Sequence, residues 1–133
     1  MIVNDTVLKG FFAAIATGIT AIFGGFDTLL YYLFIFLVAD YITGLLCAVY
    51  RKEVSSSIGL NGIIKKVMQL FLVVVASVVD NVGGMTQPIF RTLVIYFLLA
   101  NEGISILENV AGAGVPVPDF LREALTKIKN KQE

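Results

Sequence analysis

The chain has 133 residues, of which 57% are hydrophobic and only 15% are charged, and its mean hydropathy is +0.86. Because so few polar side chains cannot cover a water-facing surface, we predict an integral membrane protein. The formal net charge is zero, which argues against nucleic-acid binding. The sequence has no histidine and a single cysteine, Cys47. Catalytic triads, most zinc sites and an intrachain disulfide are therefore excluded, and we expect neither an enzyme nor a metal or cofactor site.

The first half of the chain contains two apolar segments. The first covers about residues 7–26 and includes the longest uncharged run, Gly10–Phe26. Crossing a bilayer core takes about 20 residues of helix. Lys9 precedes this run as in a signal peptide, but another hydrophobic segment follows almost at once, and we interpret the run as a transmembrane helix. The second segment covers residues 28–50 and is uncharged except for Asp40.

The second half of the chain predicts two further spans and a short tail. After a loop rich in serine and glycine, in which we expect Asn61 to cap the next helix, the third segment covers residues 63–82. Pro88 opens the fourth segment, residues 88–110, as proline does in a first helical turn. The fold class we predict is an all-α membrane protein of a single domain. It has about four transmembrane helices and a C-terminal amphipathic interfacial helix at residues 118–131.

This tail combines an apolar stripe with basic side chains. Its apolar residues recur at helical spacing, and they are Leu121, Ala124, Leu125 and Ile128. Its basic residues are Arg122, Lys127, Lys129 and Lys131. We predict a helix that lies on the anionic inner leaflet of the membrane. The alternative is a docking site for a soluble partner.

Basic residues are distributed unevenly over the predicted connections. If both termini are cytoplasmic, nine lysines and arginines lie on the cytoplasmic side, and only Arg91 lies on the other. Positive charge concentrates in the cytoplasmic connections of membrane proteins. We therefore expect a multi-pass protein of the cytoplasmic membrane with an even number of spans and both termini inside.

Asp40 is the most informative ionisable residue within a predicted span. It lies about 18 Å of helix rise from the start of its segment, close to the expected midplane. Gly44 and Ala48 follow it at i+4 and i+8, and small residues at this spacing let helices approach closely. Asp40 should therefore face a neighbouring helix. It is either an assembly or gating carboxylate or a structural acid hydrogen-bonded to Thr43 or to another helix.

Other polar and small residues also form stripes. Gly10, Ala14 and Gly18 lie on one face of the first segment and favour tight packing against a helix of this chain or of another copy. The third and fourth segments carry polar stripes that either seal against each other or line water. The candidates for assembly or gating, besides Asp40, are Thr43, Gly44, Ala48, Lys65, Lys66, Gln69, Ser77, Asp80, Arg91, Asn101, Glu102, Ser105, Glu108 and Asn109.

Depth along the predicted spans suggests which of these charges pair. Lys65 or Lys66 should lie near Glu108 at the inner end, and Asp80 should lie near Arg91 at the outer end. Such pairs are expected because an unpaired charge in hydrocarbon is costly.

Several short motifs resemble one family in the same order and with matching gaps. Residues Asp40–Leu46 resemble the D-x-x-T-G-L-L signature of the toxin-secretion/phage-lysis holin family of Gram-positive bacteria and their phages. Ser55–Lys66, Asn101–Asn109 and Val115–Leu121 resemble further blocks of that family. The likeness covers roughly residues 28–128. At one position the chain departs from the pattern, because many relatives carry a lysine where this sequence has a cysteine.

This resemblance implies a holin, a small protein of the bacterial inner membrane that accumulates, forms homo-oligomers and abruptly opens lesions in the lipid bilayer. Its functional partner would be a murein hydrolase or, in some bacteria, a secreted toxin. The residues by themselves leave two other functions open. One is a small ion channel or transporter that uses Asp40 and Glu102 as ion-coupling carboxylates. The other is a scaffold that recruits a partner through the basic tail.

Overall fold

The computed structural model describes residues 3–132, and the side chains of residues 3–130. It contains five helices and no strand within this range. They are α1 (Asp5–Ile22), α2 (Thr28–Arg51), α3 (Ser56–Val82), α4 (Ile89–Gly112) and α5 (Asp119–Gln132). Helices α1 to α4 are long and apolar enough to cross a membrane. The predicted all-α class, with four candidate spans and a C-terminal helix, is confirmed.

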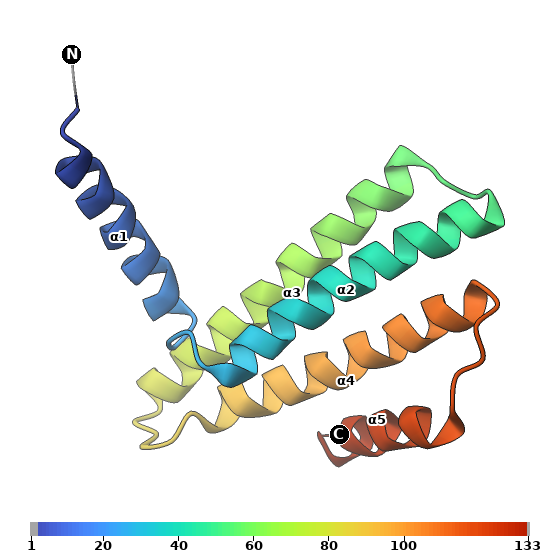
Figure 1. Ribbon diagram of the computed structural model, residues 1–133. Coiled ribbons are helices and arrows are strands. Elements are labelled where there is room, and N and C mark those ends of the chain that lie inside the picture. Colours follow the sequence, from blue (N-terminus) through green and yellow to red (C-terminus); the bar gives the residue numbers. More distant parts are fainter. Residues whose placement is uncertain (1–2, 133) are drawn as a thin grey trace.

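Helices α2, α3 and α4 form a three-helix bundle (Figure 1). Its core is made of aliphatic side chains from all three helices, namely Leu30, Leu33, Leu37, Val73, Ile95 and Leu98. The α1–α2 and α3–α4 connections lie at one end of the bundle, whereas the α2–α3 and α4–α5 connections lie at the other (Figure 1). This arrangement fits a chain that crosses a membrane repeatedly.

Helix α1 leaves the bundle and points away from it (Figure 1). None of its residues is buried. A Cβ atom added at Gly10 or Gly18 would meet nothing within 4 Å. Within the described chain, therefore, the small-residue face of α1 has no helix packed against it. The predicted end of this segment at residue 26 is wrong, because the helix ends at Ile22.

The structure corrects the start of the third helix from residue 63 to Ser56. Ser55, and not Asn61, is the N-cap, and its side chain accepts a hydrogen bond from the backbone N–H of Ile58. Sequence reasoning placed a loop here because glycine weakens a helix. Packing overrides this preference, since Cβ atoms at Gly59 and Gly62 would lie only 3.4 and 3.5 Å from the Tyr41 side chain.

The remaining boundaries shift by one or two residues. Helix α4 ends at Gly112 instead of residue 110, and Pro88 precedes it as its N-cap. The tail helix covers Asp119–Gln132. It turns back and lies along the second half of α4 (Figure 1).

Candidate functional site

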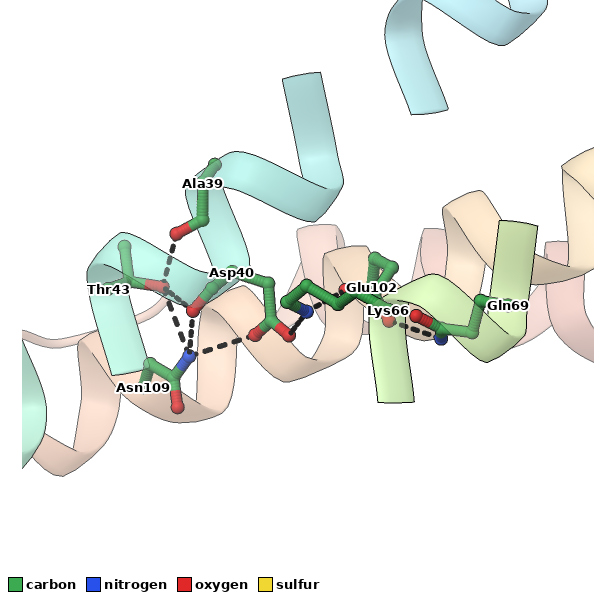
Figure 2. Close-up of polar contacts among 7 residues, drawn as sticks. All are labelled: Ala39, Asp40, Thr43, Lys66, Gln69, Glu102 and Asn109. Carbon is green, nitrogen blue, oxygen red and sulfur yellow. Dashed lines mark hydrogen bonds and ion pairs between the residues drawn. The ribbon is translucent and has the colours of Figure 1, made fainter. Parts of the chain in front are cut away.

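Three charged side chains meet between α2, α3 and α4 (Figure 2). The Lys66 ammonium donates to Asp40 Oδ2 at 2.6 Å and to Glu102 Oε2 at 2.8 Å. Gln69 Nε2 donates to the other oxygen of Glu102 at 2.7 Å. The side chains of Lys66, Asp40 and Glu102 are only 16%, 13% and 4% exposed. One cation from α3 thus joins a carboxylate from each of its two neighbours.

Asn109 of α4 completes this arrangement on the α2 side (Figure 2). Its Nδ2 donates to Asp40 Oδ1 at 2.9 Å and to Thr43 Oγ1 at 3.0 Å. The Thr43 hydroxyl itself donates to the backbone carbonyl of Ala39 at 2.8 Å. Gly44 faces α4 at this point, since a Cβ there would be in ordinary van der Waals contact with Asn109 Nδ2, at 3.5 Å. We call Asp40, Thr43, Lys66, Gln69, Glu102 and Asn109 the mid-span cluster.

The position of the mid-span cluster corrects one predicted ion pair. Lys66 contacts Asp40 and Glu102, and among the described residues neither Lys65 nor Lys66 forms the predicted ion pair with Glu108, which is exposed. The three paired residues each lie in the middle third of a helix of 24, 27 or 24 residues. With all three ionised, two negative charges face one positive charge. The prediction that Asp40 faces a neighbouring helix is confirmed.

A polar cavity of about 600 Å³ opens beside the mid-span cluster. Tyr41, Gly44, Lys65, Asn101 and Ser105 are among the residues that line it. These five residues come from α2, α3 and α4. The cavity therefore lies between the same three helices that the side chains of the mid-span cluster connect. Among the described residues, no group of three or more cysteine, aspartate or glutamate side chains is placed to hold a metal ion.

A second polar cluster lies at the end of the bundle where α1 and α2 are connected. Arg91 is 2% exposed. Its guanidinium donates to Asp27 Oδ2 at 2.7 Å, to the Gly25 carbonyl at 2.9 Å and to the Phe23 carbonyl. Asp27 in turn is the N-cap of α2 and accepts from Leu30 N at 3.0 Å. One arginine therefore fastens the α1–α2 turn to the start of α4.

Asp80 lies near Arg91 as predicted, but the two side chains do not form the predicted ion pair. The Asp80 carboxylate accepts from the backbone N–H groups of Phe90 and Arg91, both at 2.9 Å, and so caps the start of α4. Ser77 is buried against the same turn, where a Cβ at Gly24 would lie 2.7 Å from Ser77 Oγ. Gly24 also has φ +78°, which favours glycine.

We call Phe23, Gly25, Asp27, Asp80 and Arg91 the turn cluster. Sequence reasoning missed Asp27 as the partner of Arg91, although an aspartate directly before an apolar run is a typical N-cap. The Arg91 guanidinium beside Asp27 holds the pKa of that carboxyl below its ordinary value, and the hydrogen bond from Leu30 acts in the same direction.

The other predicted residues lie apart from both clusters. Ala48 is half-buried on α2, and Arg122, Lys127 and Lys129 belong to α5. Lys131 is also part of α5, but its side chain lies outside the described side chains.

At the other end of the bundle, Arg51 Nε donates to the Gly112 carbonyl at 3.1 Å and so caps the C-terminus of α4.

Comparison with known proteins gives consistent results. The family model described as the bacteriophage holin family matches residues 17–130. An uncharacterized protein of Clostridium perfringens (strain 13 / Type A) is 45% identical over 117 residues, 88% of this chain and 87% of that protein. A second Clostridium perfringens protein, an uncharacterized 14.9 kDa protein in the nagH 3′ region, is 42% identical over 94% of this chain and 95% of its own length.

A more distant relative carries a functional name. The probable holin of Bacillus phage phi105 is 30% identical over 96 residues, 72% of this chain and 70% of that protein. No solved structure matches this chain. The match of the family model over residues 17–130 includes both polar clusters and most of α5. The chain belongs to the bacteriophage holin family.

Proposed function

We propose that this chain is a lesion-forming holin of a bacterial cytoplasmic membrane. Copies accumulate in the bilayer, associate and open a passage for a murein hydrolase or a toxin. Family membership supports the holin role. The observation that supports the mechanism is the mid-span cluster, in which Lys66 of one span contacts Asp40 and Glu102 of the other two.

The mid-span cluster links helix packing to the presence of water. While Lys66 contacts both carboxylates, the charges of these three side chains are paired within the bundle. If α3 moved away from α2 and α4, the separated charges would face hydrocarbon, which is costly, unless water entered with them. Separation of the helices therefore favours assemblies that enclose water. This coupling accounts for an abrupt change from a sealed membrane to an open lesion.

The bundle also has surfaces for association between copies. Helix α1 buries none of its residues in the single chain. Its small-residue stripe, which includes Gly10 and Gly18, lets another helix approach closely. A second copy of this chain is the partner we propose for this stripe, which makes the lesion a homo-oligomer.

Both termini face the cytoplasm in this proposal, and the basic residues of α5 contact the anionic inner leaflet before lesions open. A cysteine replacing Ser56, in a Cys47→Ser background, should be shielded from an impermeant thiol reagent added outside intact cells. A cysteine replacing Thr86 should be labelled. Labelling at position 56 before lesions open would contradict this topology.

The decisive experiment is controlled expression in a bacterium, alone and together with a cytoplasmic murein hydrolase. We expect a sudden loss of membrane potential at a defined time in both cultures, and lysis only when the hydrolase is present. A matched culture that expresses the hydrolase alone should not lyse. Stable membrane potential at full expression in the membrane fraction would refute the proposal.

The polar cavity of about 600 Å³ favours a second candidate, a small ion channel or transporter. Gln69 Oε1 is buried beside this cavity and accepts no hydrogen bond from the described residues, so it could take part in binding a cation. Ion flux that saturates with substrate, without passage of macromolecules, would support this function over a holin.

A further inference from the structure

Helix α5 is fixed against the second half of α4 by its connection and by one close contact. The chain reverses at Gly114, where φ is +86°, and a Cβ there would lie 3.2 Å from the Tyr50 hydroxyl. Beyond the turn, α5 runs back along α4 (Figure 1). A Cβ added at Gly103 would lie 2.9 Å from Leu125 Cδ1 and 3.2 Å from the Phe36 ring. Because Gly103 has no side chain, Leu125 can pack closely against α4 at this position. We call this contact site on α4 the Gly103 seat.

The packing of α5 is shallow apart from this contact. Leu121 and Ile128 lie on the same stripe as Leu125, yet they remain 42% and 40% exposed. The outward face of α5 carries exposed polar side chains, including Arg122, Glu123 and Lys127. With its apolar stripe towards α4 and its charges outward, α5 replaces an apolar surface of the bundle by a charged one.

The depth of this contact is incompatible with surrounding lipid. Gly103 lies nine residues before the end of α4 at Gly112, which corresponds to about 14 Å of helix rise. If α4 spans the bilayer, as the proposed function requires, docked α5 holds its charged face well inside the hydrocarbon layer. Charged side chains at such depth need water or a counter-charge. Helix α5 therefore cannot be docked on α4 while lipid surrounds this face of the bundle.

We propose that α5 forms the inner part of the wall of the lesion. Before opening, α5 lies on the inner leaflet, and lipid covers the Gly103 seat. During opening, α5 docks on α4 before the mid-span cluster separates, because docked α5 and the intact cluster occur together in the structure, and the charged face of α5 then borders the water of the lesion. Its 14 residues extend about 21 Å along the lesion. This proposal depends on the holin function, and it assigns the water-facing surface to a helix outside the four spans.

The test compares two substitutions that add the same charge to neighbouring positions of α5. Leu125→Glu removes the side chain that seats against Gly103, whereas Thr126→Glu alters an exposed position. The purified variants are inserted into vesicles of phosphatidylglycerol and phosphatidylethanolamine that enclose a fluorescent dextran. Because the contact of a half-buried leucine is lost, we expect Leu125→Glu to slow dextran release about tenfold or more. Thr126→Glu should release dextran like the unmodified chain, and both variants should insert equally.

A disulfide between positions 103 and 125, built by Gly103→Cys and Leu125→Cys in a Cys47→Ser background, tests the docked position directly. Dextran release that continues when the disulfide is oxidised supports the proposal. Release that stops on oxidation and returns on reduction would overturn it, because α5 would then have to leave α4 for opening. Unchanged release by Leu125→Glu would also overturn it. If the unmodified chain releases no dextran, the holin function itself is refuted.

Discussion

The two polar clusters of this protein satisfy their charges in different ways. In the turn cluster, Arg91 and Asp80 bind mostly backbone groups, so that their partners are held by the fold itself. In the mid-span cluster, the Lys66 side chain binds the Asp40 and Glu102 side chains, and the three come from separate helices. The proposed opening of a lesion requires the second cluster to separate, which needs no helix to unfold, while the first cluster keeps its backbone contacts.

The largest effect is expected from breaking the mid-span cluster at its cation. Lys66→Met keeps the length of the side chain but leaves two carboxylates without a cationic partner. Loss of one member of a buried charge network costs about 3–5 kcal/mol. We expect the free energy of unfolding in detergent micelles to fall by that amount, together with the amount of protein in the membrane fraction.

The matched control for Lys66→Met removes the whole charge network. A triple variant, Asp40→Asn, Lys66→Met and Glu102→Gln, should recover stability to within about 1 kcal/mol of the unmodified chain, because no unpaired charge remains. Its lysis time should still change, since the coupling to water is lost. If the single and triple variants were equally unstable, side-chain pairing would not be what holds this cluster together.

The turn cluster should be sensitive to geometry and not only to charge. Arg91→Lys keeps the positive charge, but a single ammonium cannot reach both carbonyls and Asp27 as the guanidinium does. We expect a loss of about 2 kcal/mol in the free energy of unfolding. Arg51→Lys, at an exposed arginine with one backbone contact, should cost less than about 0.5 kcal/mol. Equal effects would mean that Arg91 acts only through its charge.

A smaller change is expected from Asp40→Asn, which removes one charge and preserves the shape of the side chain. The amide can still contact Asn109, and Lys66 keeps Glu102 as a partner. We expect a loss of about 1–2 kcal/mol in the free energy of unfolding and a measurable shift in lysis time. If Asp40→Asn and Asp40→Leu both left the lysis time unchanged, the gating role of Asp40 would be refuted.

The smallest effect concerns pH and isolates the turn cluster. Because Arg91 lowers the pKa of Asp27 below its ordinary value of 3.8, the contact stabilises the fold above pH 3.8. This contribution is lost as the pH falls through the lowered pKa. Unfolding in detergent micelles should therefore become easier below about pH 4. Asp27→Asn should lack this part of the pH dependence, and an unchanged profile would exclude Asp27 as its source.

Much of the fold follows from local patterns of the sequence. Predominantly apolar segments long enough to cross a bilayer identify four of the five helices, and the apolar stripe of residues 121–128 identifies the fifth. The start of α3 could not be predicted in this way. Gly59 and Gly62 look like loop residues until the Tyr41 ring is seen to pack against them.

The charged residues likewise show what the sequence could predict and what only the packing of the helices decided. The spacing of small residues after Asp40 and the cost of burying charge already placed Asp40 against a neighbouring helix and predicted that Lys65 or Lys66, and also Arg91, would be paired. Only the tertiary structure decided that Lys66 bridges Asp40 and Glu102, that Asp27 takes Arg91, and that α5 seats on Gly103. The physical reason is that a pattern along one helix defines a face and a depth. The rotation and offset of the neighbouring helices, set by packing of the whole bundle, determine which side chains meet there.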